Sequence, residues 1–122
     1  MILLEDGPGG RPALFDKARR LVIARRAEDL AGALATLDAA RAEGLWVAGW
    51  IAYEAGYALE PKLGALMPEG AGPLLVFGLF DAPQEAGPVL EQARAEARGV
   101  AVAAPEPMIS RIAYDAAMAR VM

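Results

Sequence analysis

The sequence contains no cysteine, no histidine and no asparagine, and it has a single serine, Ser110, and a single threonine, Thr36. The lack of cysteine excludes disulfide bonds and thiol redox chemistry. Without histidine as well, the common zinc sites cannot form, nor can a Ser-His or Cys-His nucleophile pair. Carboxylates remain available for magnesium binding or acid–base catalysis, so these absences exclude certain classes of enzyme but not all enzymes.

The charge balance is acidic, with 12 basic and 16 acidic residues and a formal net charge of -4. Nucleic-acid binding requires clustered positive charge, so no nucleic-acid partner is expected. The longest apolar run, Leu45–Tyr53, is far shorter than the ~20 residues that span a bilayer, so no membrane partner is expected either. The N-terminus lacks the basic and apolar regions of a signal peptide. We therefore expect a soluble, cytoplasmic protein.

The apolar pattern predicts an α+β fold, a mixed α/β arrangement with a largely antiparallel sheet and two to three helices. The 122 residues suffice for one domain or a piece of one. Residues 27–43 form the clearest helix, because apolar residues recur there at helical spacing and Gly44 is a natural stop. Gly49 indicates a bulge or a close backbone approach within a buried strand. The other expected elements are strands at Leu21–Ala24, Leu45–Tyr53, Leu74–Phe80 and Val100–Ala103, and helical segments at Glu54–Leu59, Val89–Arg98 and Arg111–Met122, the last capped by Ser110.

Two groups of charged residues are candidates for chemistry. Four arginines, Arg19, Arg20, Arg25 and Arg26, bracket the first buried strand and suggest either an anion site or solvated strand ends that discourage edge-to-edge pairing; the second reading is favoured. Glu54 and Glu60 flank Tyr57, and paired carboxylates can act in acid–base catalysis or bind a cation. Six residues apart across a glycine-containing turn, they are more simply explained as solvated side chains.

Several segments form an ordered pattern along the chain: Leu3-Leu4-Glu5-Asp6-Gly7, Leu14-Phe15-Asp16, Gly49-Trp50-Ile51-Ala52-Tyr53-Glu54 and Phe77-Gly78-Leu79-Phe80-Asp81. The third is the most specific, and it continues through Ala55-Gly56-Tyr57-Ala58-Leu59-Glu60-Pro61. In this order and spacing, the chain resembles the N-terminal region of component I of aminodeoxychorismate synthase, in the family that includes anthranilate synthase component I. Within this resemblance, Ser110–Met122, with Tyr114, looks like the first helix of the family's chorismate-binding domain.

The resemblance implies an N-terminal domain at 1–108 and the start of a truncated chorismate-binding domain at 109–122. The full-length enzyme would convert chorismate and ammonia to aminodeoxychorismate, a precursor of para-aminobenzoate and folate. A separate glutaminase subunit would supply the ammonia, and magnesium would neutralise the carboxylates of chorismate. The family's catalytic residues and magnesium ligands lie in the later domain. We therefore expect no catalytic residue, metal ligand or cofactor in this chain.

Many members of this family hold tryptophan in a pocket to which the N-terminal part contributes. By resemblance, the pocket segments here contain Asp6 and the run Ala13, Leu14, Phe15 and Asp16. Asp6 stands where the family carries a serine in Leu-Leu-X-Ser. Its carboxylate would oppose the carboxylate of an amino acid and attract its ammonium group. Phe15 is equally well explained as an ordinary core residue.

Other interpretations of the sequence remain open. The chain also fits the N-terminal region of anthranilate synthase component I or of an isochorismate-type relative. A different class of interpretation is a free-standing small-molecule-binding or interaction module. Ile112, Met118 and Val121 of the last helix would be left exposed, and self-association is expected because exposed apolar area tends to be covered by a partner or a second copy.

Overall fold

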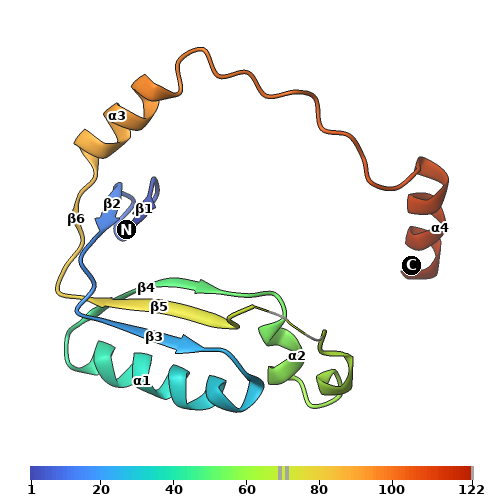
Figure 1. Ribbon diagram of the computed structural model, residues 1–122, viewed down its shortest axis with the longest axis horizontal. Helices are drawn as coiled ribbons and strands as arrows, with labels where there is room; N and C mark the ends of the chain where they lie inside the picture. The colour runs from blue at the N-terminus through green and yellow to red at the C-terminus, as the bar shows by residue number, and fades with distance from the viewer. Residues whose placement is uncertain (69, 71, 122) are drawn as a thin grey trace. The chain divides into compact units, whose positions relative to one another are not determined.

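The computed structural model describes residues 1–68, 70 and 72–121, and the described part of the chain is a mixed α+β structure (Figure 1). It divides into two compact units, residues 1–92 and 93–122. The first unit holds two antiparallel three-stranded sheets and most of the helices. The predicted α+β class, with its largely antiparallel sheet, is confirmed.

The larger sheet contains the strands β3 (Arg20–Ala24), β4 (Trp46–Ile51) and β5 (Leu75–Phe80), in the order β3-β5-β4. β5 is therefore central, and it pairs antiparallel with both neighbours. Val22 lies opposite Phe77 on one side, and Gly49 lies opposite Phe77 on the other. The pairing of β4 with β5 through a loop was predicted from the sequence and is confirmed.

One face of this sheet is covered by helix α1 (Leu30–Ala42), which follows the short 3-10 helix η1 (Ala27–Asp29) (Figure 1). The predicted stripe of apolar residues on α1 faces the strands, and it packs against Val22, Leu75 and Leu79. Gly44 has φ 85°, which an L-residue rarely adopts, so a glycine ends the helix as expected. The buried members of the stripe are Leu30, Ala33, Leu37 and Ala40.

The smaller sheet contains β1 (Ile2–Leu4), β2 (Ala13–Phe15) and β6 (Gln84–Glu85), in the order β1-β2-β6. β2 is its central strand, and all three residues of β2 are buried. Phe15 contacts Phe80 of the larger sheet, with ring centroids 5.3 Å apart. The two sheets therefore meet through an aromatic contact at the end of β5.

The remaining helices of the described residues are α2 (Ala55–Leu59), the 3-10 helix η2 (Gly64–Leu66), α3 (Gly87–Glu96) and α4 (Arg111–Val121). The predicted helices at 54–59, 89–98 and 111–122 correspond to α2, α3 and α4, with Met122 outside the described residues. Ser110 caps α4 as expected, because the N–H of Ala113 donates to its Oγ at 3.2 Å. Within the second unit, every described residue of α4 is exposed.

Two local predictions were wrong. Residues 100–103 form no strand: they lack regular secondary structure and all are exposed. β4 was expected to be buried, but four of its six residues are exposed, and only Ala48 is buried. The glycine and proline residues between Pro68 and Pro73 predict a loop, and residues 69 and 71 of this segment lie outside the described residues.

Candidate functional site

The segments expected to line a tryptophan-type pocket lie in the smaller sheet and the loop before it. Ala13, Leu14 and Phe15 form β2 and are 4%, 8% and 2% exposed. Because side chains alternate along a strand, Leu14 points away from the other two. Leu14 packs with Ala86 and Leu90, whereas Ala13 and Phe15 pack with Ala48 and Phe80 in a second cluster. All three side chains therefore contribute to the core.

The two acidic residues of these segments lie outside that core. Asp6 is exposed, in the loop that joins β1 to β2. The N–H of Gly7 closes this loop by donating to the carbonyl oxygen of Arg11 at 2.9 Å. Asp16 follows β2 and is half-buried. The two expected pocket segments lie side by side, because β1 pairs with β2 and Leu3 of β1 lies opposite Leu14 of β2.

A hollow of about 300 Å³ lies between Phe15 and the larger sheet. Neither Asp6 nor Asp16 lines it, and none of the described residues that line it carries a charge. That volume is at the lower end for small-molecule sites, which also need a few placed polar groups to fix a ligand. The hollow therefore suits an apolar group but offers no partner to the charged ends of an amino acid. It is lined by Ile2, Leu4, Pro8, Phe15, Trp46, Val47, Ala48, Gly49 and Phe77.

Two of the four arginines around β3 form ion pairs with carboxylates among the described residues. Arg19 forms an ion pair with Asp81. Arg26 contacts Glu28 and Asp29, each at 3.1 Å. The hydrogen bond that Arg26 donates to Asp29 lowers the pKa of Asp29 and raises that of Arg26. These pairings favour the interpretation of the arginines as strand-end charges over that of an anion site.

Glu54 and Glu60 lie at the two ends of α2. Glu54 is half-buried and Glu60 is exposed, where its Oε1 accepts a hydrogen bond from the N–H of Lys62 at 3.4 Å. Tyr57, between them in sequence, lines an apolar hollow of about 390 Å³ together with Tyr53. Within the described part of the chain, no three acidic side chains gather in a group that could hold a metal ion.

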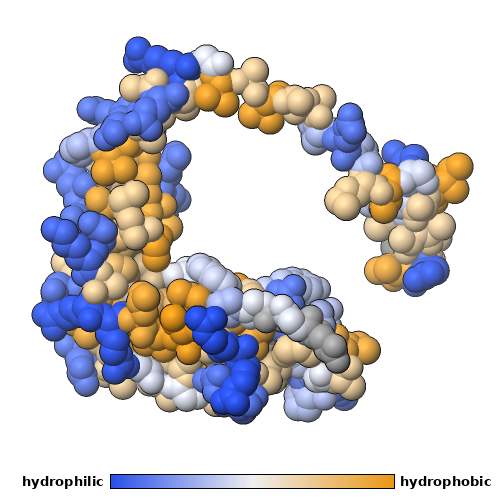
Figure 2. Space-filling view, viewed as in Figure 1, coloured by the Kyte–Doolittle hydropathy of each residue, from blue (hydrophilic) through white to orange (hydrophobic). Residues whose placement is uncertain are grey.

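The sequence reading missed an uncovered apolar surface on the larger sheet. Leu21 and Ile23 of β3 and Trp50 of β4 are 59%, 41% and 48% exposed on the face opposite α1. Val76 of β5 lies between Ile23 and Trp50 in the register. Figure 2 shows hydrophobic residues gathered over these strands. We call Leu21, Ile23, Trp46, Trp50 and Val76 the open face of the sheet.

A signal for the open face was present in the sequence. β4 carries no polar residue on either side, and a continuous apolar run predicts burial on both faces of a strand. Such a run equally fits a strand with one face in the core of its own domain and the other face in contact with another domain or protein. The strand itself was predicted correctly, but on the face opposite α1 the described residues of the smaller sheet cover Ala48 and leave Trp50 exposed.

No protein-family model matches this chain, and comparisons with curated proteins and with solved structures find no match. Among the described residues, no helix has both the length and the apolar character needed to cross a membrane.

Proposed function

We propose that this chain is the N-terminal domain of component I of an aminodeoxychorismate synthase, and that its role there is structural or regulatory rather than catalytic. The chemistry would belong to a chorismate-binding region that follows it. Ammonia released from glutamine by a glutaminase subunit would displace the hydroxyl group of chorismate there, and magnesium would neutralise the substrate carboxylates.

The observation that carries this proposal is the contact among the segments that resemble the family. Gly49–Glu54 runs from β4 into α2, and Phe77–Asp81 covers the end of β5, which pairs directly with β4. Leu3–Gly7 begins in β1 and is joined to β2. Phe15 of β2 then contacts Phe80 of β5. Segments far apart in sequence thus contact one another, as is expected if they are the defining parts of a single domain.

The open face of the sheet also supports a domain that functions as part of something larger. Exposed apolar area that is contiguous tends to mark a surface that another protein or domain covers. A catalytic region packed on such a face would be held in place by it.

The test uses the protein produced from the complete gene, supplied with chorismate, magnesium and an ammonium salt. We expect aminodeoxychorismate, identified by its mass, and no turnover by the 122-residue chain under the same conditions. Anthranilate as the product would favour the anthranilate synthase alternative. Unreacted chorismate with a folded, complete protein would overturn the assignment.

The alternative of an interaction module without an enzyme is favoured by the same open face. A complete gene that encodes no chorismate-binding region would support it. In that case no chorismate turnover is expected from the complete protein, and the function would lie in binding another protein at the open face.

A further inference from the structure

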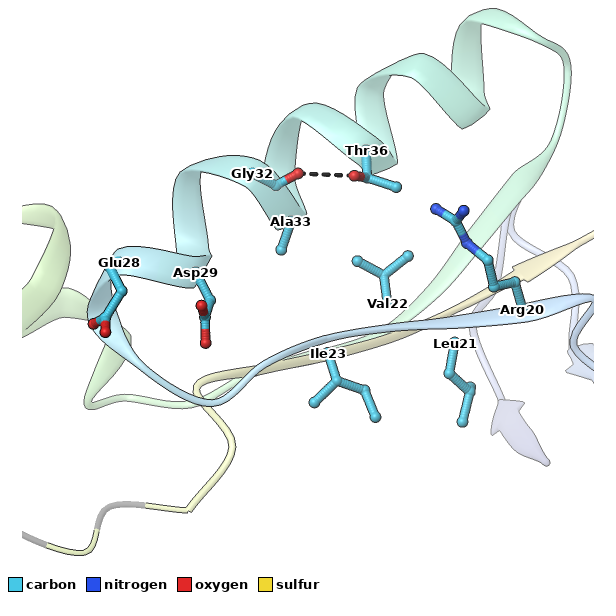
Figure 3. A pocket seen from close by; sticks show the side chains of 9 residues that line it. All are labelled: Arg20, Leu21, Val22, Ile23, Glu28, Asp29, Gly32, Ala33 and Thr36. Carbon is cyan, nitrogen blue, oxygen red and sulfur yellow. Dashed lines mark hydrogen bonds between the residues drawn. The ribbon is translucent and has the colours of Figure 1, made fainter.

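Strand β3 lies at one edge of the larger sheet, and its outer side borders a hollow of about 670 Å³ beneath α1 (Figure 3). Val22 and Ala33 face each other across this hollow, while Leu21 and Ile23 point to the opposite side of the sheet. Gly32 widens it, since a Cβ on that residue would have no heavy atom within 4 Å. The edge strand is therefore accessible along its length.

The hydrogen-bond pattern identifies which backbone groups of β3 are free. The N–H of Ala52 donates to the carbonyl of Leu74, which places the even-numbered residues of β5 in hydrogen bonds with β4. In an antiparallel ladder these groups alternate from side to side, so the odd-numbered residues of β5 face β3. Phe77 lies opposite Val22, and hence the N–H and C=O groups of Leu21 and Ile23 point outward.

The two ends of the hollow carry opposite charge. Arg20 stands at one end, and Glu28 and Asp29 stand at the other (Figure 3). Among the described residues, Arg26 alone forms ion pairs with these two carboxylates, so their end keeps a net negative charge. Among the ion pairs of the described residues, none includes Arg20. A strand that binds antiparallel to β3 and begins with a basic residue would place that positive charge beside the carboxylates of Glu28 and Asp29.

We propose that the free edge of β3 pairs antiparallel with β3 of a second copy of this chain, about a two-fold axis at Val22. In this register Leu21 lies opposite Ile23 of the second copy, and the outward N–H and C=O groups of both residues are satisfied in both copies. Arg20 of each copy lies beside Ala24 of the other, close to the carboxylates of Glu28 and Asp29. The two three-stranded sheets become one sheet of six strands, and the isologous contact closes on itself.

Flanking arginines protect an edge when they repel an incoming strand. In this register Arg19 lies opposite Arg25 of the second copy. Arg19 is already paired with Asp81, and the carboxylate of Asp81 offsets the repulsion between Arg19 and Arg25 of the second copy. The three central residues of β3, Leu21, Val22 and Ile23, are uncharged and β-forming. Pairing also places Leu21 and Ile23 of both copies side by side on the open face.

Sedimentation velocity of the full chain over a range of concentrations tests this pairing, with Ile23→Pro as the first variant. The outward N–H of Ile23 makes no bond within the monomer, so proline at this edge position is compatible with the fold. We expect it to raise the dimer dissociation constant by about 30-fold, since one hydrogen bond is lost in each half of the pair. Circular dichroism checks that the variant stays folded.

Two further variants separate this contact from others. Arg20→Glu should weaken the dimer, and adding Glu28→Arg should restore it by exchanging the charges. Trp50→Glu, on the open face but away from the β3 edge, should leave the dissociation constant unchanged. Amide exchange at Leu21 and Ile23 should slow as the concentration rises. A chain that stays monomeric, or a dimer that Ile23→Pro spares or Trp50→Glu abolishes, would overturn the proposal.

Discussion

Arg26 and Asp29 illustrate how much of the local structure depends on a few polar atoms. The N–H of Arg26 donates to Asp29 Oδ2 at 3.2 Å, and its guanidinium nitrogens donate to both carboxylate oxygens at 3.3 and 3.1 Å. These bonds span the 3-10 turn that precedes α1 and place negative charge in the first turn, where the helix dipole favours it. The acidic start of the helix was visible in the sequence, but its arginine partner was not.

This contact makes part of the folding free energy dependent on pH. The hydrogen bond from Arg26 lowers the pKa of Asp29 in the folded state. Stability from this group is therefore present above the ordinary carboxyl pKa and is lost as the pH falls through the lowered value. Arg26→Gln should move the Asp29 midpoint up toward the ordinary range, as followed by carboxyl carbon NMR. An unchanged midpoint would show that Arg26 does not hold the carboxylate.

Phe15 and Asp6, both assigned by resemblance to one pocket, should respond differently to substitution. Phe15→Ala removes a side chain that is 2% exposed, and should lower the free energy of unfolding by about 3–5 kcal/mol in urea denaturation. Asp6→Ser changes an exposed loop residue and should have an effect within about 0.5 kcal/mol. Similar small effects for both variants would indicate that Phe15 lines a ligand site instead of the core.

At the scale of elements, Gly49 is required by the close approach of β4 to β5. A Cβ at this position would lie 2.6 Å from Phe77 Cα, closer than real Cβ atoms come to backbone. The sequence left two explanations for this glycine, a bulge or a close approach. The register from Trp46 to Ile51 is unbroken, which identifies the close approach as the reason.

Two glycine-to-alanine substitutions should therefore change the free energy of unfolding in opposite directions. Gly49→Ala should destabilise the chain by about 3 kcal/mol, because the added carbon meets backbone that cannot turn aside. Gly32→Ala, at an exposed position of helix α1 with open space around it, should stabilise the chain by up to about 1 kcal/mol. Thermal unfolding of the pair checks both. A neutral Gly49→Ala would mean that the strands separate more readily than the register suggests.

Elements with a clear periodic pattern were predictable from sequence, and those that depended on a partner were not. The apolar stripe of α1 identified both the helix and its buried side, since the strands it covers lie nearby in sequence. The pattern Val100-Ala-Val-Ala predicted a strand, but a strand needs a neighbour to bond with, and local sequence does not supply one. The exposure of Trp50 was likewise missed, because a continuous apolar run does not show which face of a strand is covered.

At the scale of the whole molecule, the first unit carries the features on which function can be argued. The open face, the free edge of β3 and the hollow beside Phe15 all lie within residues 1–92. The resemblance to chorismate-using enzymes could be stated from sequence, since it depends on ordered motifs. Which surfaces are left uncovered could not, because exposure is a property of packing between segments distant along the chain.

The last prediction concerns the stretch between the helices α3 and α4. Residues 101–107 have no regular secondary structure and are all exposed, so local opening there should cost little free energy. An elastase-type protease, which cleaves after small aliphatic residues, should therefore cut first within residues 101–103, before Ala39 in α1, and the product that contains residues 1–92 should keep a cooperative unfolding transition. The triple variant Ala101→Glu, Val102→Glu, Ala103→Glu is the matched control, and mass spectrometry of the early products should show this cleavage disappear in it. Early cleavage after Ala39 at a comparable rate would indicate that the first unit does not hold α1 firmly against its sheet.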